Sequence, residues 1–430
     1  ELVIHRGGFV LPDILQADRT QELPLSYAQQ RLWFIDQLGS GSVQYNMPGR
    51  FHLQGELDVA AFEAALQELL ARHEVLRTHF GMSESGEPYQ AIRETYELPL
   101  TRHDLSALDG PAQTEAVRRI SEEEARAPFN LEADLMLRVR LLKLSVQDHL
   151  VLYTMHHIAS DGWSMGVLQS EFSVLYNAYS HGEEPDLAPL PVQYADYALW
   201  QRDWLQGEVL AAQLDYWRGQ LAGVPVVHSL PLDRVRPPEQ TYAGRMHRQV
   251  IDREMSAGLR ALCEQQGVTL FMLLETAFAV LLGRYSNETD MVVGTPIAGR
   301  VHQDVEGLIG FFVNSLVLRS DLSDNPDFIT LLQTNRRMIL DAYTHQHIPF
   351  EMLVEDVQPQ RSLSHNPLFQ ILFAVQNNER GLVELQDLAI GETGKKSYSD
   401  AVRSRFELEV QVYESGGQLM IGWLYNRALF

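Results

Sequence analysis

Two adjacent histidines are the residues of this sequence with the clearest capacity for chemistry. They lie in the segment 155–164, which reads MHHIASDGWS. Residues 150–157 are apolar and rich in β-formers, so we expect a strand that ends at the histidines. Because successive side chains of a strand point to opposite faces, His156 and His157 are predicted to face apart. One can then enter a cleft while the other packs inside.

The turn after this strand carries two further candidates. Asp161 follows His157 by four residues, and its carboxylate can support the turn or pair with a cation. Gly162 permits a tight turn at the start of a helix, where free backbone N–H groups suit an oxyanion. The alternative, that both histidines are hydrogen-bonded core residues, is equally consistent with the pattern.

The same stretch contains a second catalytic pattern. Gly162, Ser164 and Gly166 spell G-x-S-x-G, which is typical of the nucleophile elbow of α/β-hydrolases. An elbow needs the strand to run directly into the first glycine, whereas residues 158–161 intervene here. A serine hydrolase that uses Ser164 is therefore a weaker alternative.

Composition restricts the classes of protein. The chain has 430 residues with 34 Lys or Arg and 57 Asp or Glu, so its formal net charge is −23. This acidity disfavours nucleic acid and an anionic membrane as partners. The longest apolar segment, 271–282, is shorter than the ~20 residues of a membrane span. The single Cys263 excludes an internal disulfide and favours a cytoplasmic location. No metal site is expected, since His345 and His347 lack a third ligand at recognisable spacing.

Helical and strand patterns alternate along the whole chain, so we expect a mixed α/β fold. Residues 1–22 are predicted to be a linker, and 181–193 an acidic, proline-rich crossover between two domains, 23–180 and 181–430. Predicted helices span 26–38, 58–73, 112–127, 269–285, 327–344 and 349–357, with a further one beginning after Gly162. Predicted strands span 135–144, 150–157, 291–295, 311–319 and 369–376, and 75–80 with 89–93 form a hairpin.

Seven segments carry a family resemblance that covers residues 23–426. They are LPLSYAQQRLWFIDQL (23–38), ARHEVLRTHF (71–80), MHHIASDGWS (155–164), YADYALWQRDWL (194–205), IGFFVNSLVLR (309–319), HQHIPFEMLVE (345–355) and RSLSHNPLFQILF (361–373). In this order they resemble the motifs of the condensation domains of nonribosomal peptide synthetases, which are related in fold to chloramphenicol acetyltransferase. The third matches the family's HHxxxDG, whereas Ser315 and His347 stand where Thr and Asp are more usual.

The resemblance implies two chloramphenicol-acetyltransferase-like lobes in a V-shaped pseudo-dimer, with a central tunnel between them. Phosphopantetheine arms of a donor and an acceptor peptidyl carrier protein would enter that tunnel, and the domain itself would bind no cofactor. The acceptor amine would attack the donor thioester and form an amide. An adjacent adenylation domain is an implied partner, the isolated domain is expected to be a monomer, and the chain is expected to be truncated at its C-terminal end.

The resemblance also assigns roles to residues. It makes His157 catalytic, either as a base or by orienting the amine, and gives the oxyanion to the backbone N–H of Gly162. His156 and Asp161 become structural supports, and Arg284 is predicted to be the arginine that pairs with Asp161. The side chains assigned to the tunnel or its turns are Arg31, Trp163, Ser164, Asn314 and Ser315.

The substrate is less sharply indicated than the reaction. The motifs most resemble the subtype that joins an L-configured donor to an L-configured acceptor. A starter type that N-acylates the first amino acid with a fatty acyl group, and a type that uses a D-configured donor, stay open. A catalytically silent scaffold of the same fold is a further alternative, against which the intact HHxxxDG argues.

Overall fold

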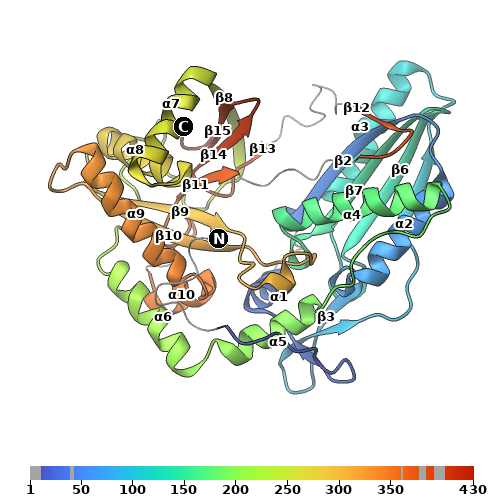
Figure 1. The fold of residues 1–430 in the computed structure, drawn as a ribbon, viewed down its shortest axis with the longest axis horizontal. Coiled ribbons are helices and arrows are strands. Elements are labelled where there is room, and N and C mark those ends of the chain that lie inside the picture. The colour runs from blue at the N-terminus through green and yellow to red at the C-terminus, as the bar shows by residue number, and fades with distance from the viewer. Residues whose placement is uncertain (1–10, 39–42, 360–361, 377–383, 392–401) are drawn as a thin grey trace.

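Two sheet-bearing lobes spread from a shared base that contains α1 (Tyr27–Leu38) and α5 (Tyr194–Trp204) (Figure 1). A computed structural model describes residues 11–38, 43–359, 362–376, 384–391 and 402–430. Residues 1–10 of the predicted linker lie outside this part of the chain. The mixed α/β fold expected from the sequence is confirmed.

The first lobe, on the right in Figure 1, is a sheet with helices on both faces. Its elements are β2 (Asn46–Gln54), α2 (Val59–Arg72), β5 (Leu100–Asp104), α3 (Gly110–Arg126), β6 (Leu137–Ser145), β7 (Asp148–His156), α4 (Gly162–Ser180) and β12 (Ala389–Gly391). The strand order is β12-β2-β7-β6-β5, and β7 runs antiparallel to both of its neighbours.

Burial on two faces explains the apolar run of β7. Val151 and Tyr153 pack in the core beneath α2 and α4, whereas Leu150 and Leu152 pack in the core beneath α3. A central strand covered on both faces needs apolar residues at every position rather than at alternate ones. The strand that ends at His156 is thus held by packing on both faces.

A small second sheet lies at the base of the first lobe. Its strands are β1 (Leu23–Pro24), β3 (Thr78–Met82) and β4 (Pro88–Ile92), in the order β1-β4-β3. The predicted hairpin at 75–80 and 89–93 is confirmed by the antiparallel pairing of β3 with β4, although residues 74–77 form a short 3-10 helix.

The second lobe contains a seven-stranded sheet with the order β10-β9-β11-β14-β15-β8-β13. Its strands are β8 (Ala243–Ile251), β9 (Asp290–Ile297), β10 (Asn314–Asp321), β11 (Ile371–Gln376), β13 (Val402–Arg403), β14 (Leu408–Ser415) and β15 (Gln418–Asn426). The helices beyond α5 are α6 (Gly207–Gln220), α7 (Arg253–Gln266), α8 (Leu270–Ser286), α9 (Phe328–Thr344) and α10 (Phe350–Val357). Among the described residues no single helix is long and apolar enough to cross a membrane; α7 and α8 pass that test only as a pair bent by 105°.

The chain returns to the first lobe after the predicted boundary near residue 180. α5 and the loop that precedes β10 both add side chains to the core beneath α2 and α4, including Val305, Leu308 and Phe312. β12 pairs antiparallel with β2 and so extends the first sheet. Each lobe therefore has its own sheet, but the core of the first lobe uses residues from both halves of the sequence.

Most predicted elements are confirmed to within a few residues, and two kinds of difference remain. The strand expected at 311–319 begins at Asn314, because the N–H of Phe312 donates to the carboxylate of Asp161 (3.0 Å) rather than to a neighbouring strand. Several elements were not predicted: β2, β5, β8, α7, β14, β15 and the short strands β1, β12 and β13.

Two glycines test how tightly the second lobe is packed. A Cβ on Gly294, in β9, would overlap the ring of Phe369, whereas a Cβ on Gly258, exposed on α7, would meet no atom within 4 Å. We expect Gly294→Ala to lower the free energy of unfolding by roughly 1–3 kcal/mol through overpacking. Gly258→Ala should raise it by up to about 1 kcal/mol, since alanine favours a helix. Urea unfolding of both variants measures the two changes in the free energy of unfolding. Equal changes in the two variants would contradict this account.

Candidate active site

The histidine pair lies where β7 turns into α4. β7 ends at His156, residues 157–159 form a 3-10 helix, and α4 begins at Gly162. The turn is held from outside by α1, since the side-chain amide of Gln29 donates to Ile158 O (3.3 Å). The histidines are therefore fixed by backbone structure on both sides.

His156 is a buried structural residue. Its side chain is fully enclosed, and its ring meets Phe129 edge-on at 5.5 Å and Tyr45 at 6.4 Å between centroids. Its Nδ1 accepts a hydrogen bond from Ile158 N (3.1 Å). Burial, with the charges of His157 and Arg138, lowers the pKa of His156 to about 3, so the ring is neutral and closes the turn.

His157 presents one ring nitrogen to a cavity. Its Nδ1 lies 2.7 Å from Ser160 O, and because a carbonyl oxygen only accepts, Nδ1 carries the proton. Nε2 is then the acceptor, and the ring packs at 4.5 Å between centroids from Phe311. Burial, and after it the positive charge of Arg405, lower the pKa of His157 to about 4. The ring is therefore neutral and can accept a proton or a hydrogen bond.

The carboxylate of Asp161 joins the turn to a loop of the second half of the chain. It caps α4 by accepting from Ser164 N (2.8 Å), and it also accepts from Phe312 N (3.0 Å). Its ion-pair partner is Arg300, whose Nη2 lies 3.4 Å away. The predicted partner, Arg284, is wrong: it lies exposed in the last turn of α8.

Arg300 was missed in the sequence because it falls in an irregular loop. Its guanidinium is 3% exposed and donates to Leu308 O (2.7 Å), to Val305 O and to Ser164 Oγ (2.9 Å). It also lies over the ring of Phe312, 4.1 Å from the centroid. The signal available in the sequence was the glycine before Arg300, shortly after the end of β9. Gly299 has a φ of +66°, a backbone conformation that favours glycine.

Ser164 is a structural residue of the turn rather than a nucleophile. Its hydroxyl is fully buried, lies 2.7 Å from the Asp161 carboxylate, and accepts from Gly310 N (3.0 Å) and Arg300 Nη2. A nucleophilic serine needs access to substrate and a histidine as base. Neither condition is met by a hydroxyl enclosed by an aspartate and an arginine, so the geometry argues against the hydrolase alternative.

Gly162 and Trp163 lie exposed in the first turn of α4. A Cβ on Gly162 would meet no atom within 4 Å, so the fold itself does not require glycine there. The residues that line the cavity do not include Gly162, and its role as an oxyanion donor stays a prediction. The indole of Trp163 donates to Glu306 O (2.9 Å), which ties the turn to the loop of the second half.

A cavity of about 1360 Å³ lies between the two lobes, and His157 is part of its wall. The first lobe contributes Tyr45 and Thr154, and the second contributes Phe311 and Arg405. A volume of this size exceeds that of most small-molecule sites and can hold extended substrates from more than one direction. Among the described residues, no group of three His, Cys, Asp or Glu side chains is arranged to hold a metal ion.

The remaining predicted residues, Arg31, Asn314 and Ser315, line the same cavity. Arg31 of α1 forms an ion pair with Glu351 of α10 and so links the two lobes. Asn314 lines the cavity, but its amide donates to Ile348 O (2.8 Å), so it mainly holds the turn before α10. Ser315 lines the cavity as the second residue of β10. Of the predicted residues, His157, Arg31, Asn314 and Ser315 therefore line the cavity. The others, apart from Arg284, belong to the turn between β7 and α4: His156, Asp161, Gly162, Trp163 and Ser164.

Comparisons with known proteins agree with this geometry. The family described as "Condensation domain" matches residues 19–430. Among curated relatives, two proteins of the linear gramicidin synthase of Brevibacillus parabrevis are 46% identical over 97% of this chain and 42% identical over 100% of it. The chain spans only 8% and 6% of the lengths of these two relatives. The solved complex of the X-domain and OxyB from teicoplanin biosynthesis is similar with a TM-score of 0.84 and 29% identity, covering 99% of this chain and 92% of that one.

The corrected ion pair leads to a direct test. Arg300→Leu leaves Asp161 as a buried carboxylate without its cation, and loss of one partner of a buried pair costs about 3–5 kcal/mol. Arg284→Leu removes an exposed side chain and should change the free energy of unfolding by less than about 0.5 kcal/mol. Chemical unfolding of the two variants measures the difference. A loss with Arg284→Leu as large as with Arg300→Leu would contradict the assignment.

The lowered pKa of His157 predicts a dependence of stability on pH. The unfolded chain binds a proton at this histidine below about pH 6.5, whereas the folded chain binds it only near pH 4. Stability is therefore lost as pH falls through this window, by about 1.4 kcal/mol per pH unit for one histidine. The free energy of unfolding of His157→Gln should fall less than that of the wild type between pH 7 and pH 5, by about 2 kcal/mol. The exposed His247→Gln is the control, and identical pH profiles for wild type and His157→Gln would refute the prediction.

Proposed function

The chain belongs to the condensation-domain family of nonribosomal peptide synthetases, and from this membership we propose that it joins two carrier-bound thioesters through an amide bond. Condensation domains are the acyltransferases that form amide bonds in these synthetases. The observation that carries the proposal for this chain is the neutral His157, whose Nε2 is left as an acceptor in the wall of a cavity between two lobes.

The proposed substrates are two thioesters held on phosphopantetheine arms. The donor arm brings an acyl or peptidyl thioester from one carrier protein, and the acceptor arm brings an aminoacyl thioester with a free amine from another. The amine nitrogen attacks the donor carbonyl carbon, the C–N bond forms, the C–S bond breaks, and the departing sulfur takes the proton that the amine loses. The products are the lengthened acceptor thioester and a free thiol on the donor arm.

Much of the rate enhancement can come from holding the two substrates together. A thioester is already activated, so no acyl-enzyme is needed, and well-oriented pairs reach effective molarities of ~10⁵–10⁸ M. The cavity walls come from both lobes, which suits substrates that arrive from two partners. His157 adds a fixed acceptor, which can orient the amine through a hydrogen bond or take its proton. The pKa of about 4 favours orientation of a neutral amine, because a base this weak takes a proton poorly.

The subtype and the setting are finer parts of the same proposal. The motif residues support an L-configured donor and an L-configured acceptor, with a fatty acyl starter and a D-configured donor as the alternatives. The adjacent adenylation domain and the two carrier proteins are the proposed partners, and the cytoplasm is the proposed location.

A single-turnover assay with a loaded donor carrier and a loaded acceptor carrier tests the function. We expect the wild type to form an amide with an L-aminoacyl donor, and His157→Ala to slow that step by about 10²–10⁴-fold, the usual contribution of a positioned acid–base group. The amide product is measured by mass spectrometry of the acceptor carrier.

The other outcomes separate the alternatives. Faster reaction with D-aminoacyl or fatty acyl donors would replace the proposed subtype and keep the reaction. No amide with any donor and acceptor pair would favour a silent scaffold. Labelling of Ser164 by a fluorophosphonate would instead identify a serine hydrolase.

A further inference from the structure

Arg405 brings a positive charge into the cavity from the second lobe. It lies between β13 and β14, its side chain is exposed, and it lines the same cavity as His157. Arg31, which also lines the cavity, is neutralised by Glu351. Within the described ranges no ion-pair contact is found for Arg405, although its charge also acts on the buried carboxylate of Glu409, which lines the same cavity.

The backbone of Arg405 is held from both sides. Its N–H donates to the buried carboxylate of Glu409 (2.6 Å), which also accepts from Phe406 N (3.2 Å). Its carbonyl oxygen accepts from the side-chain amides of Gln240 and Asn366, both at 2.9 Å. Four hydrogen bonds thus fix the short loop that carries the cation, although the side chain itself is exposed.

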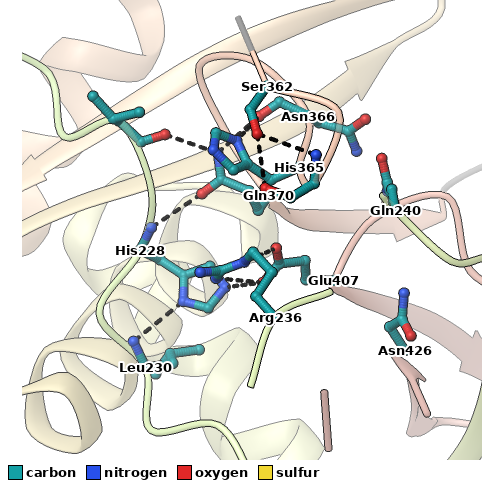
Figure 2. Close-up of polar contacts among 12 residues, drawn as sticks. His228, Leu230, Arg236, Gln240, Ser362, His365, Asn366, Gln370, Glu407 and Asn426 are labelled. Carbon is teal, nitrogen blue, oxygen red and sulfur yellow. Dashed lines mark hydrogen bonds and ion pairs between the residues drawn. The ribbon is translucent and has the colours of Figure 1, made fainter. Parts of the chain in front are cut away.

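A buried network of hydrogen bonds and ion pairs is centred on Glu407, two residues after Arg405 (Figure 2). The carboxylate of Glu407 is 1% exposed and accepts two hydrogen bonds from Arg236, at 2.8 and 2.9 Å. Its second oxygen lies 2.7 Å from His228 Nε2. Asn366 belongs to the same network, because its carbonyl oxygen accepts from the side-chain amide of Gln370 (2.9 Å), whose own oxygen accepts from His228 N (3.0 Å). A fixed backbone holds the Cα of Arg405 at the cavity wall, so the flexible side chain starts from a defined position when charge develops near it.

Arg405 and His157 line one cavity, and the charge of Arg405 lowers the pKa of the His157 ring. Burial lowers the pKa of His157 most, and the charge of Arg405 is the second-largest cause. The other charge that acts on this ring, Asp161, raises the pKa, and the neighbouring His156 is neutral. Electrostatic effects weaken with distance, so a cation that acts on the ring also acts on a substrate that lies against it.

This inference rests on the proposed function: we propose that Arg405 stabilises the negative charge that develops on the donor thioester's carbonyl oxygen during attack. As the amine nitrogen bonds to carbon, the π electrons of the C=O bond move to oxygen. They return when the C–S bond breaks, and the departing sulfur takes the amine proton. Arg405 gives up no proton in this sequence of steps. Its cation takes the role that the family resemblance assigned to the N–H of Gly162.

The test compares Arg405→Met and Arg405→Lys with the wild type, and uses Arg248→Met as the control. Arg248 is an exposed arginine of β8 that does not line the cavity. At pH 7.5 and saturating loaded carriers, we expect Arg405→Met to slow single-turnover amide formation about 10²-fold, the usual loss for one oxyanion donor. Arg405→Lys should recover part of the rate, and Arg248→Met should keep the full rate. Thermal melting confirms that each variant is folded.

A second measurement locates the charge without using activity. The ring of His157, followed by NMR, should take up its proton at a higher pH in Arg405→Met than in the wild type and in Arg248→Met. An unchanged amide-forming rate in a folded Arg405→Met would overturn the proposal. So would a slower rate with no shift in the His157 titration, because Arg405 would then act elsewhere. A wild type that forms no amide with any donor would instead refute the proposed function, which distinguishes the two failures.

Discussion

The buried carboxylate of Asp161 is the interaction on which the rest of the site depends. A carboxylate taken out of water is costly unless it is fully hydrogen-bonded and paired. Asp161 meets that requirement only by combining Ser164 of its own turn with Phe312 and Arg300 from the second half of the chain. The cost of burying one charge therefore forces the histidine turn and the distant loop into a single arrangement.

The geometry of His157 follows from this arrangement. Phe311, the neighbour of Phe312 in the same loop, packs against the imidazole, while Ser160 O fixes its tautomer. The ring is held on both sides before any substrate arrives, and burial keeps it uncharged. A preorganised, neutral acceptor suits a reaction whose electrophile is already activated and whose main difficulty is alignment. The excess of acidic residues in the chain does not extend to this region, where Arg405 gives the cavity a local positive charge.

The sequence predicts those features that are encoded locally. Helix α8 has a continuous apolar pattern and the cap Thr269, and β7 has an unbroken apolar run, so both were predicted correctly. The hairpin of β14 and β15 was missed although Gly416 and Gly417, both with positive φ, mark its turn. Arg300 could not be ranked above Arg284 by pattern, because the pairing depends on how a loop folds back over a chain separation of 139 residues. Long-range polar contacts of this kind leave little trace in local spacing.

The return of the chain to the first lobe affects how the protein folds during synthesis and which segments can be exchanged between related proteins. The core beneath α2 and α4 is incomplete until Val305, Leu308 and Phe312 have left the ribosome, and the sheet gains its edge strand β12 later still. Because translation adds about 5–20 residues per second, the hydrophobic face of the first lobe stays uncovered for many seconds. A chimera of two related synthetases joined near residue 180 would combine the first-lobe core of one protein with the core residues Val305, Leu308 and Phe312 of the other. The smallest unit that can be moved intact is both lobes together.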